Sequence, residues 1–291
     1  MEFIKEAVDK KIILKQDIGI NQFLIENNLT QIEKIINFFN SDTPLLLING
    51  FMGTGKVMVV NQALSFLSED VITLRYNCFE TTILDDILLE FFDNFKRLTA
   101  QGVIQYPKVR TENFTQKINA YFDSILKPVI VVINSFEQIL KNNKQEILDF
   151  ILHISNLTNV KIILIGRKFD YTDFGENFER VAISALEKGI FEKYLKAEDF
   201  KQIGPLSDEL YKYSRGYYFY TTLAIKVMQT RKLSLMDFLS GYTKSFLSFN
   251  EFILREALSL VDPVSGHLLR FLTIMRHPVN VKLLKTLNLY N

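Results

Sequence analysis

A short glycine-rich segment followed by a lysine is the part of the sequence best suited to chemistry. Residues 50–57 match the pattern G-x-x-x-x-G-K and continue with a valine. Glycines let the backbone turn tightly, so that successive N–H groups point inward and surround an anion. We therefore predict a phosphate-binding loop, with the lysine reaching the β- and γ-phosphates of ATP or ADP. The predicted contact residues are Gly50, Phe51, Met52, Gly53, Thr54, Gly55, Lys56 and Val57.

The residues that normally hold Mg²⁺ in such a site are both altered. The position after the lysine is usually Ser or Thr, whose hydroxyl binds the metal, but here it is Val57. An apolar run at 129–133 is followed by Asn134, where an acidic residue is expected. A neutral amide is a poor partner for a hard cation. We therefore assign no metal ligand and expect nucleotide binding with weak or absent metal-dependent hydrolysis.

Two charged residues are the candidate catalytic groups. Glu137 lies three positions after Asn134, in the region of the acid that activates the attacking water; the alternative is an exposed carboxylate at a helix start. Arg167 follows the apolar run at 161–165, at the strand end where ligands of such sheets sit, and is placed to contact the γ-phosphate. The alternative is a surface arginine paired with Asp170.

Composition indicates a globular protein without the net positive charge that would attract nucleic acid. The 291 residues are 48% hydrophobic and 23% charged, and the formal net charge is +1. The single cysteine, Cys78, excludes an internal disulfide framework and a cysteine-based zinc site. No apolar run reaches the length of a membrane span, and residues 1–16 are too charged for a signal peptide. We expect a cytoplasmic protein without a membrane partner.

Apolar runs alternate with helical patterns over the first 185 residues, which predicts a parallel sheet covered on both faces. A capping box at Thr30 and Glu33 predicts a helix start at that point, and residues 169–179 are expected to form a polar loop. The predicted strands are 45–48, 71–76, 129–133, 161–165 and 180–184. The predicted helices are 30–40, 56–67, 84–98, 112–126 and 144–157.

Strand patterns stop near residue 185, which we take as a domain boundary. Ser207 is the expected N-cap of one of the helices beyond it. Arg215, next to a candidate C-cap at Gly216, is interpreted as an exposed cation at a helix end; the alternative is that it reaches the nucleotide from this helical part. The helices predicted in this part are 187–195, 207–213, 218–230, 233–239, 250–261 and 265–275.

The order of these motifs resembles the AAA+-related STAND ATPases, which include NB-ARC proteins, and is similar in layout to the origin-recognition branch. The resemblance implies a five-stranded sheet in the order 5-1-4-3-2 and a helical lid, with ATP/ADP exchange controlling assembly. It implies a nucleotide-binding domain at 1–185, a lid at 186–250 and a partial winged helix at 251–291. Arg167 stands at the family's sensor position, and Tyr218 replaces the proline of the lid's G-x-P motif.

Four functional hypotheses follow. The first is a nucleotide-dependent switch or scaffold with protein partners or self-assembly. The second is a working ATPase whose Mg²⁺ is held by phosphates and water, with Glu137 orienting the nucleophile. The third is a DNA-binding module, for which the C-terminal segment offers some cations. The fourth is an interaction protein that binds no nucleotide. The cations of the third hypothesis are Arg270, Arg276, Lys282 and Lys285.

Overall fold

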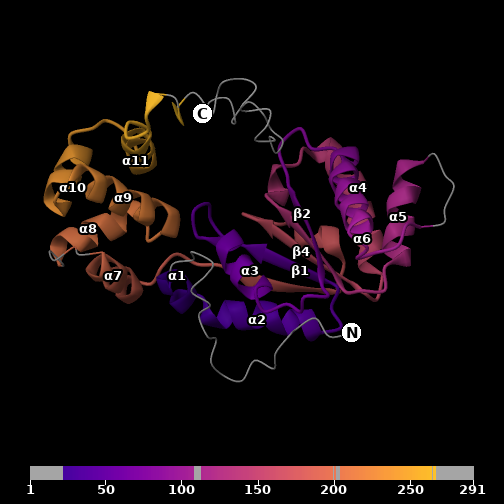
Figure 1. The fold of residues 1–291 in the computed structure, drawn as a ribbon. Coiled ribbons are helices and arrows are strands. Elements are labelled where there is room, and N and C mark those ends of the chain that lie inside the picture. The colour runs from indigo at the N-terminus through magenta and orange to yellow at the C-terminus, as the bar shows by residue number, and fades with distance from the viewer. Residues whose placement is uncertain (1–21, 108–112, 199, 201–203, 264, 267–291) are drawn as a thin grey trace. The chain divides into compact units, whose positions relative to one another are not determined.

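The computed structural model describes residues 22–107, 113–198, 200, 204–263 and 265–266. The chain divides between Ser184 and Ala185 into two compact units, each with its own internal packing. The first unit is built around a sheet, and the described part of the second consists of helices (Figure 1). Nearly all of the helix predicted at 265–275, and most of the segment expected to begin a winged helix, lie outside the described residues.

Five parallel strands form a single sheet in the order β2-β3-β4-β1-β5 (Figure 1). Read from the other edge, this is the expected order 5-1-4-3-2, so the predicted fold is confirmed. The strands are β1 (Leu45–Asn49), β2 (Ile72–Asn77), β3 (Val129–Asn134), β4 (Val160–Gly166) and β5 (Phe178–Ala182). All residues of β4 and all but the last of β3 are buried, as expected for inner strands with helices on both faces.

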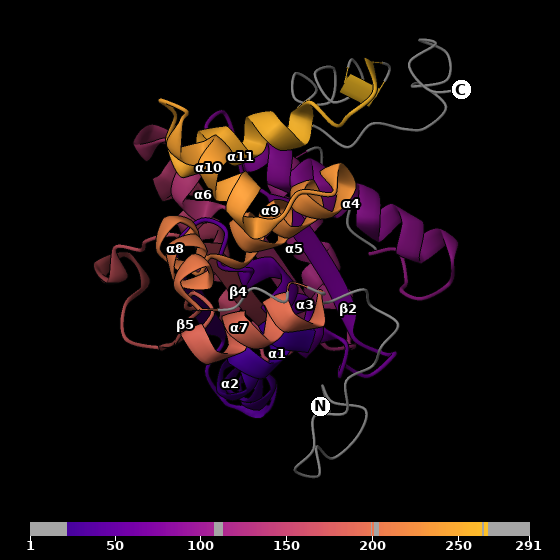
Figure 2. The same ribbon diagram turned by 90° about the vertical axis from the view of Figure 1, so that its left-hand side faces the viewer.

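Helices cover the two faces of the sheet because its strands are apolar on both sides. Leu45 and Leu47 of β1 belong to the core under α4, α5 and α6, whereas Leu46 and Ile48 alternate to the opposite face. Helices α1, α2 and α3 lie together in Figure 2 and pack on one another. The helices of this unit are α1 (Gln22–Asn27), α2 (Leu29–Asn40), α3 (Lys56–Leu64), α4 (Leu84–Ala100), α5 (Phe114–Ser124) and α6 (Lys141–Ser155).

A buried lysine in β4 links this strand to the turn before β1, at the amino end of the sheet. The side chain of Lys161, in β4, is almost fully buried and donates hydrogen bonds to the backbone oxygens of Ser41 and, at 2.7 Å, Thr43. Burial lowers the pKa of Lys161, while Asp42 opposes this effect. The turn that leads into β1 is therefore attached to β4 through a charge that is satisfied by carbonyl groups.

The second unit begins after β5, and its described residues contain a helix at five of the six positions predicted beyond residue 185. Helices α9 and α11 pack closely against each other. The helices are α7 (Lys188–Ala197), α8 (Pro205–Ser214), α9 (Tyr218–Arg231), α10 (Leu235–Thr243) and α11 (Phe249–Leu258). No helix among the described residues combines the length and apolar character needed to cross a membrane.

Three local predictions are wrong. Helix α2 begins at Leu29, with Asn28 as its N-cap, because a buried turn continues directly from α1 and leaves Thr30 inside the helix. Helix α8 begins at Pro205, so that Ser207 is its third residue rather than its cap. The expected polar loop at 169–179 packs against the core instead, because Phe169 and Phe174 are buried. It contains the short 3₁₀ helix η3 (Tyr171–Phe174), and β5 already starts at residue 178.

Candidate functional site

The glycine-rich loop links the end of β1 to the start of α3, at the carboxyl edge of the sheet. Gly53 and Gly55 have φ angles of 87° and 89°, a region that L side chains rarely adopt. Gly55 is also the N-cap of α3 and offers no side-chain acceptor. The first N–H groups of the helix are therefore left for an external anion, and the helix dipole favours negative charge at this point.

Two close approaches hold the loop against the rest of the first unit. A Cβ atom at Gly50 would lie 2.4 Å from the backbone oxygen of Ile183, the residue that follows β5. The N–H of Ile183 in turn donates to the oxygen of Asn49 at 2.8 Å. At Gly55 a Cβ would meet the side chain of Leu24, from α1, at 2.8 Å. Gly50 is thus required by space, and Gly55 by both space and backbone conformation.

Within the loop, polar side chains bond to the loop's own backbone. Lys56 Nζ donates to the oxygens of Gly50 and Phe51 at 2.8 and 3.0 Å, and the buried Thr54 hydroxyl donates to Phe51 at 2.9 Å. Burial lowers the pKa of Lys56 below its usual value, Glu137 opposes this shift, and Arg167 adds to it. The side chains of Phe51 and Met52, by contrast, are 70% and 58% exposed at the loop tip.

Glu137 and Arg167 come together as an ion pair. Arg167 Nε donates to Glu137 Oε1 at 2.7 Å; the arginine is half-exposed, whereas the glutamate side chain is only 15% exposed. Asp170, the alternative partner, instead accepts from Thr172. The second carboxylate oxygen, Oε2, is buried without a hydrogen-bond partner and lies close to Gly166. Glu137 is therefore not the solvated helix-start carboxylate of the alternative interpretation.

The chain path explains how Glu137 reaches this position. β3 ends at Asn134, and Ser135 then adopts a left-handed conformation with φ 57°. This sharp turn leads into the short 3₁₀ helix η2 (Phe136–Gln138), which packs next to β4. Because parallel strands end at the same edge, the residues following β3 and β4 meet there.

The residues at the two altered positions do not fit Mg²⁺. Val57 is the second residue of α3 and carries no oxygen ligand. The Asn134 amide donates to Asn77 Oδ1 at 3.1 Å, across the final register pair of β2 and β3. Sequence reasoning missed Asn77; its position as the last residue of a strand next to β3 was the available signal. Among the described residues, no cluster of three or more His, Cys, Asp or Glu side chains could hold a metal ion.

Cys78 takes no part in a reactive centre. It lies directly after β2 and is buried without a disulfide partner. Burial raises the pKa of its thiol to about 12, and the charge of Glu137 acts in the same direction. The thiolate form needed for nucleophilic attack is therefore suppressed at neutral pH.

Comparison with known proteins agrees with this geometry. The sequence profile of the AAA domain family matches residues 40–171, a little under half of the chain. No curated protein sequence matches. Among solved structures, a signal transduction ATPase with numerous domains (STAND) and a tetratricopeptide repeat sensor, from Pyrococcus horikoshii, is similar with a TM-score of 0.57 and 14% identity. That match covers 89% of this chain but 36% of the other, so the chain spans about a third of that protein.

Two further structures match. A Walker-type ATPase of Pyrococcus abyssi has a TM-score of 0.54 and 15% identity, covering 89% of this chain and 79% of that one. The origin recognition complex of Drosophila bound to DNA reaches a TM-score of 0.44 and 15% identity, covering 73% and 60%. At these identities the first two matches show the fold, and the third adds nothing to it.

The sheet order, the loop between β1 and α3 and the first two structural matches define a P-loop NTPase-like α/β fold. Residues 40–171 of this fold match the sequence profile of the AAA domain family. Nucleotide binding is what this family implies, and the cradle formed by the loop fits phosphate groups.

The contact at Gly50 leads to a testable prediction. We expect Gly50→Ala to lower both the stability of the first unit and nucleotide binding, because the methyl group would collide with a backbone oxygen that cannot rotate away. A loss of about 1–3 kcal/mol is typical of overpacking. Urea denaturation and ADP titration measure the two effects.

The matched control is Gly189→Ala, because Gly189 lies in α7 and the methyl group that alanine adds there would have no neighbour within 4 Å. Alanine favours a helix by about 0.5–1 kcal/mol over glycine, so this variant should be unchanged or slightly more stable. Equal behaviour of the two variants would contradict the close approach at Gly50.

Proposed function

We propose that the protein binds ATP and ADP as a nucleotide-dependent switch or scaffold, with weak or absent hydrolysis. One observation supports this proposal above the others. The anion cradle is complete, with Gly53 and Gly55 in the required conformation, whereas Val57 and Asn134 offer no oxygen suited to Mg²⁺. Backbone N–H groups and a lysine are sufficient to hold a diphosphate.

Binding would require one rearrangement inside the loop. Lys56 now donates to Gly50 and Phe51 and would exchange these carbonyl oxygens for β-phosphate oxygens. The ammonium group would exchange neutral carbonyl acceptors for negatively charged phosphate oxygens, which adds the attraction between opposite charges, so the exchange is favourable. An approaching polyphosphate also favours the charged form of a lysine whose pKa is lowered by burial.

The pair Glu137–Arg167 gives ATP and ADP different effects in this proposal. A γ-phosphate competes with Glu137 for the Arg167 guanidinium, whereas ADP leaves the 2.7 Å ion pair in place. A ligand shifts a conformational equilibrium only by its differential affinity for the two states. Release of Arg167 from Glu137 is therefore the local event that distinguishes the two nucleotides.

The lid at 186–250 and the winged-helix start at 251–291 remain proposals, as do protein partners or self-assembly. The cations considered for DNA binding, Arg270, Arg276, Lys282 and Lys285, lie outside the described residues. A net charge of +1 offers no support for binding to nucleic acid.

A second candidate function is a working Mg²⁺-dependent ATPase. The observation in its favour is Glu137 Oε2, a buried carboxylate oxygen without a partner, in a residue whose charge acts on the loop lysine. Such an oxygen is suited to accept a hydrogen bond from an attacking water. Mg²⁺ would then be held by phosphate oxygens and water alone.

One prediction concerns the metal. We expect ADP to bind with nearly the same affinity with and without Mg²⁺, a difference below about tenfold, because Val57 has no oxygen ligand and the neutral amide of Asn134 is a poor one. Nucleotide released on denaturation of the purified protein and identified by chromatography, followed by calorimetric titration of ADP and ATP, measures this. A strict requirement for Mg²⁺ would contradict the switch proposal, and no binding at all would favour a pure interaction protein.

Restoring the metal contacts provides another prediction. The double variant Val57→Ser/Asn134→Asp should gain measurable ATP hydrolysis, since it returns a hydroxyl and a carboxylate to the altered positions. The control is Val57→Ala/Asn134→Ala, which changes the same positions without adding a metal ligand. If the Ser/Asp variant binds Mg·ATP normally but releases no more phosphate than the control, the two substitutions do not explain the absence of turnover.

A further prediction separates the second candidate from the first. If the unmodified protein hydrolyses ATP, Glu137→Gln should reduce the rate by about 10²–10⁴-fold, the usual contribution of a general base. Glu146→Gln, an exposed glutamate on α6, is the control and should leave the rate unchanged. Undetectable phosphate release by the unmodified protein would remove the ATPase candidate.

A further inference from the structure

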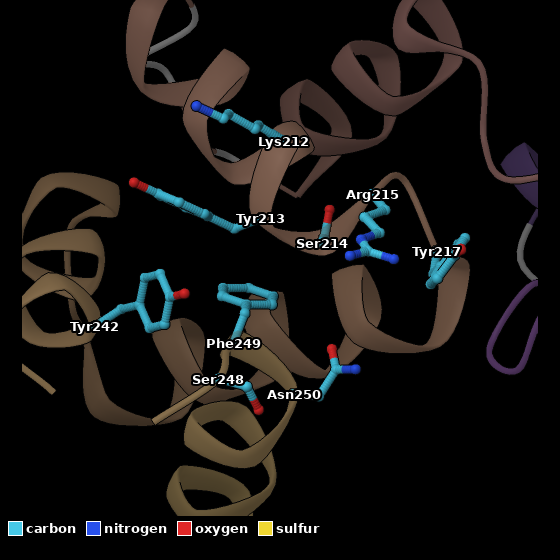
Figure 3. Close-up of a pocket in the computed structure, with 9 residues that line it drawn as sticks. All are labelled: Lys212, Tyr213, Ser214, Arg215, Tyr217, Tyr242, Ser248, Phe249 and Asn250. Carbon is cyan, nitrogen blue, oxygen red and sulfur yellow. The ribbon is translucent and has the colours of Figure 1, made fainter. Parts of the chain in front are cut away.

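The second unit contains a cavity of about 380 Å³ whose lining comes from the end of α8, the start of α9, α10 and the start of α11 (Figure 3). Every lining residue lies between 212 and 250, so the cavity belongs to this unit alone. A volume of this size falls within the range that holds small organic molecules.

One side of the cavity is a wall of three aromatic rings. Tyr213 and Tyr242 are 4.8 Å apart between ring centroids, and Tyr242 and Phe249 are 5.2 Å apart. Phe249 is 5% exposed, and both tyrosines are half-buried. Edge-to-face packing holds the rings in fixed positions and leaves a surface on which a planar group can stack.

The other side carries two cations and one amide side chain. Figure 3 shows the guanidinium of Arg215 directed between the Ser214 and Asn250 side chains, with Lys212 at the edge of the cavity. Within the described residues, Arg215, Lys212 and Asn250 have no hydrogen bond, ion pair or ring contact from their side chains. These groups are therefore available to a ligand.

No carboxylate among the described residues lines the cavity to neutralise these cations. The nearest one in sequence, Glu251, is engaged in the capping box of α11, where it accepts from the N–H and hydroxyl of Ser248 at 3.0 and 2.7 Å. A guanidinium binds phosphate or carboxylate through two parallel hydrogen bonds. The charge of the lining therefore selects an anion.

We propose that this cavity binds a small organic anion whose charged group is joined to a planar ring, the chemistry of a nucleoside monophosphate. The ring stacks on Tyr213 or Tyr242, and the anionic group is bound by Arg215 with Asn250 beside it. All lining residues of this site belong to the second unit, and the proposal does not depend on the function proposed for the phosphate loop.

The test uses the full chain carrying Lys56→Ala, so that the phosphate loop contributes little to binding. Calorimetry measures binding of adenosine monophosphate, adenosine and inorganic phosphate. We expect saturable binding of adenosine monophosphate that is at least about tenfold tighter than that of either fragment, because only the joined molecule uses both sides of the cavity. No saturable binding below about 1 mM, or equal binding of phosphate alone, would overturn the proposal.

A pair of matched variants locates the site. Arg215→Gln should weaken binding of adenosine monophosphate about ten- to a hundredfold, the usual loss for a hydrogen bond to a charged group. Lys232→Gln is the control. Like Arg215, Lys232 is an exposed cation at the left-handed C-cap of a helix, with a φ of 56° compared with 54° for Arg215. Unlike Arg215, it does not line the cavity. Equal affinities of two variants with unchanged circular dichroism would overturn the assignment.

Discussion

The path of the phosphate loop depends on one close approach, between the backbone at Gly50 and the carbonyl oxygen of Ile183, at the carboxyl edge of the sheet. β1 lies between β4 and β5, and its last residue, Asn49, accepts a hydrogen bond from Ile183 just past the end of β5. The first residue of the loop, Gly50, therefore lies so close to Ile183 that no side chain fits there. Two left-handed glycines then bring the chain back into α3, and a ring of N–H groups results.

The charges around the loop form a linked set rather than independent groups. Glu137 raises the pKa of Lys56 while Arg167 lowers it, and Glu137 and Arg167 are themselves paired. A polyphosphate would act on both cations at once, because each would exchange a protein oxygen for a phosphate oxygen. The Oε2 oxygen of Glu137 has no hydrogen-bond donor among the described residues, and a fully ionised polyphosphate has none to offer it.

The sequence predicts the elements whose signal is local and leaves out those that depend on packing across strands. Apolar runs place β1, β3 and β4, and the glycine spacing places the loop, since both patterns are contained in a few neighbouring residues. The pairing of Asn77 with Asn134 depends on the register between β2 and β3, which no motif records. The ion pair of Arg167 with Glu137 joins residues that follow two different strands, so the sequence alone did not identify it. Asp170 is closer to Arg167 in the sequence but accepts from Thr172 instead.

The amino end of β4 behaves differently from its carboxyl end because of Lys161. Its ammonium group bridges the carbonyl oxygens of Ser41 and Thr43, so the entrance to β1 and the start of β4 are joined through a buried cation. Separating the ammonium group from these carbonyl oxygens would leave a buried charge without hydrogen-bond partners. The free-energy cost of that state opposes separation of the two segments. At the carboxyl edge, by contrast, Arg167 follows β4 and pairs with Glu137, and Lys56 donates to carbonyl oxygens of the loop that follows β1. The amino end of the β1–β4 pair is therefore held by a buried charge, and the side-chain contacts that a bound anion would exchange lie at the opposite edge, which holds the loop.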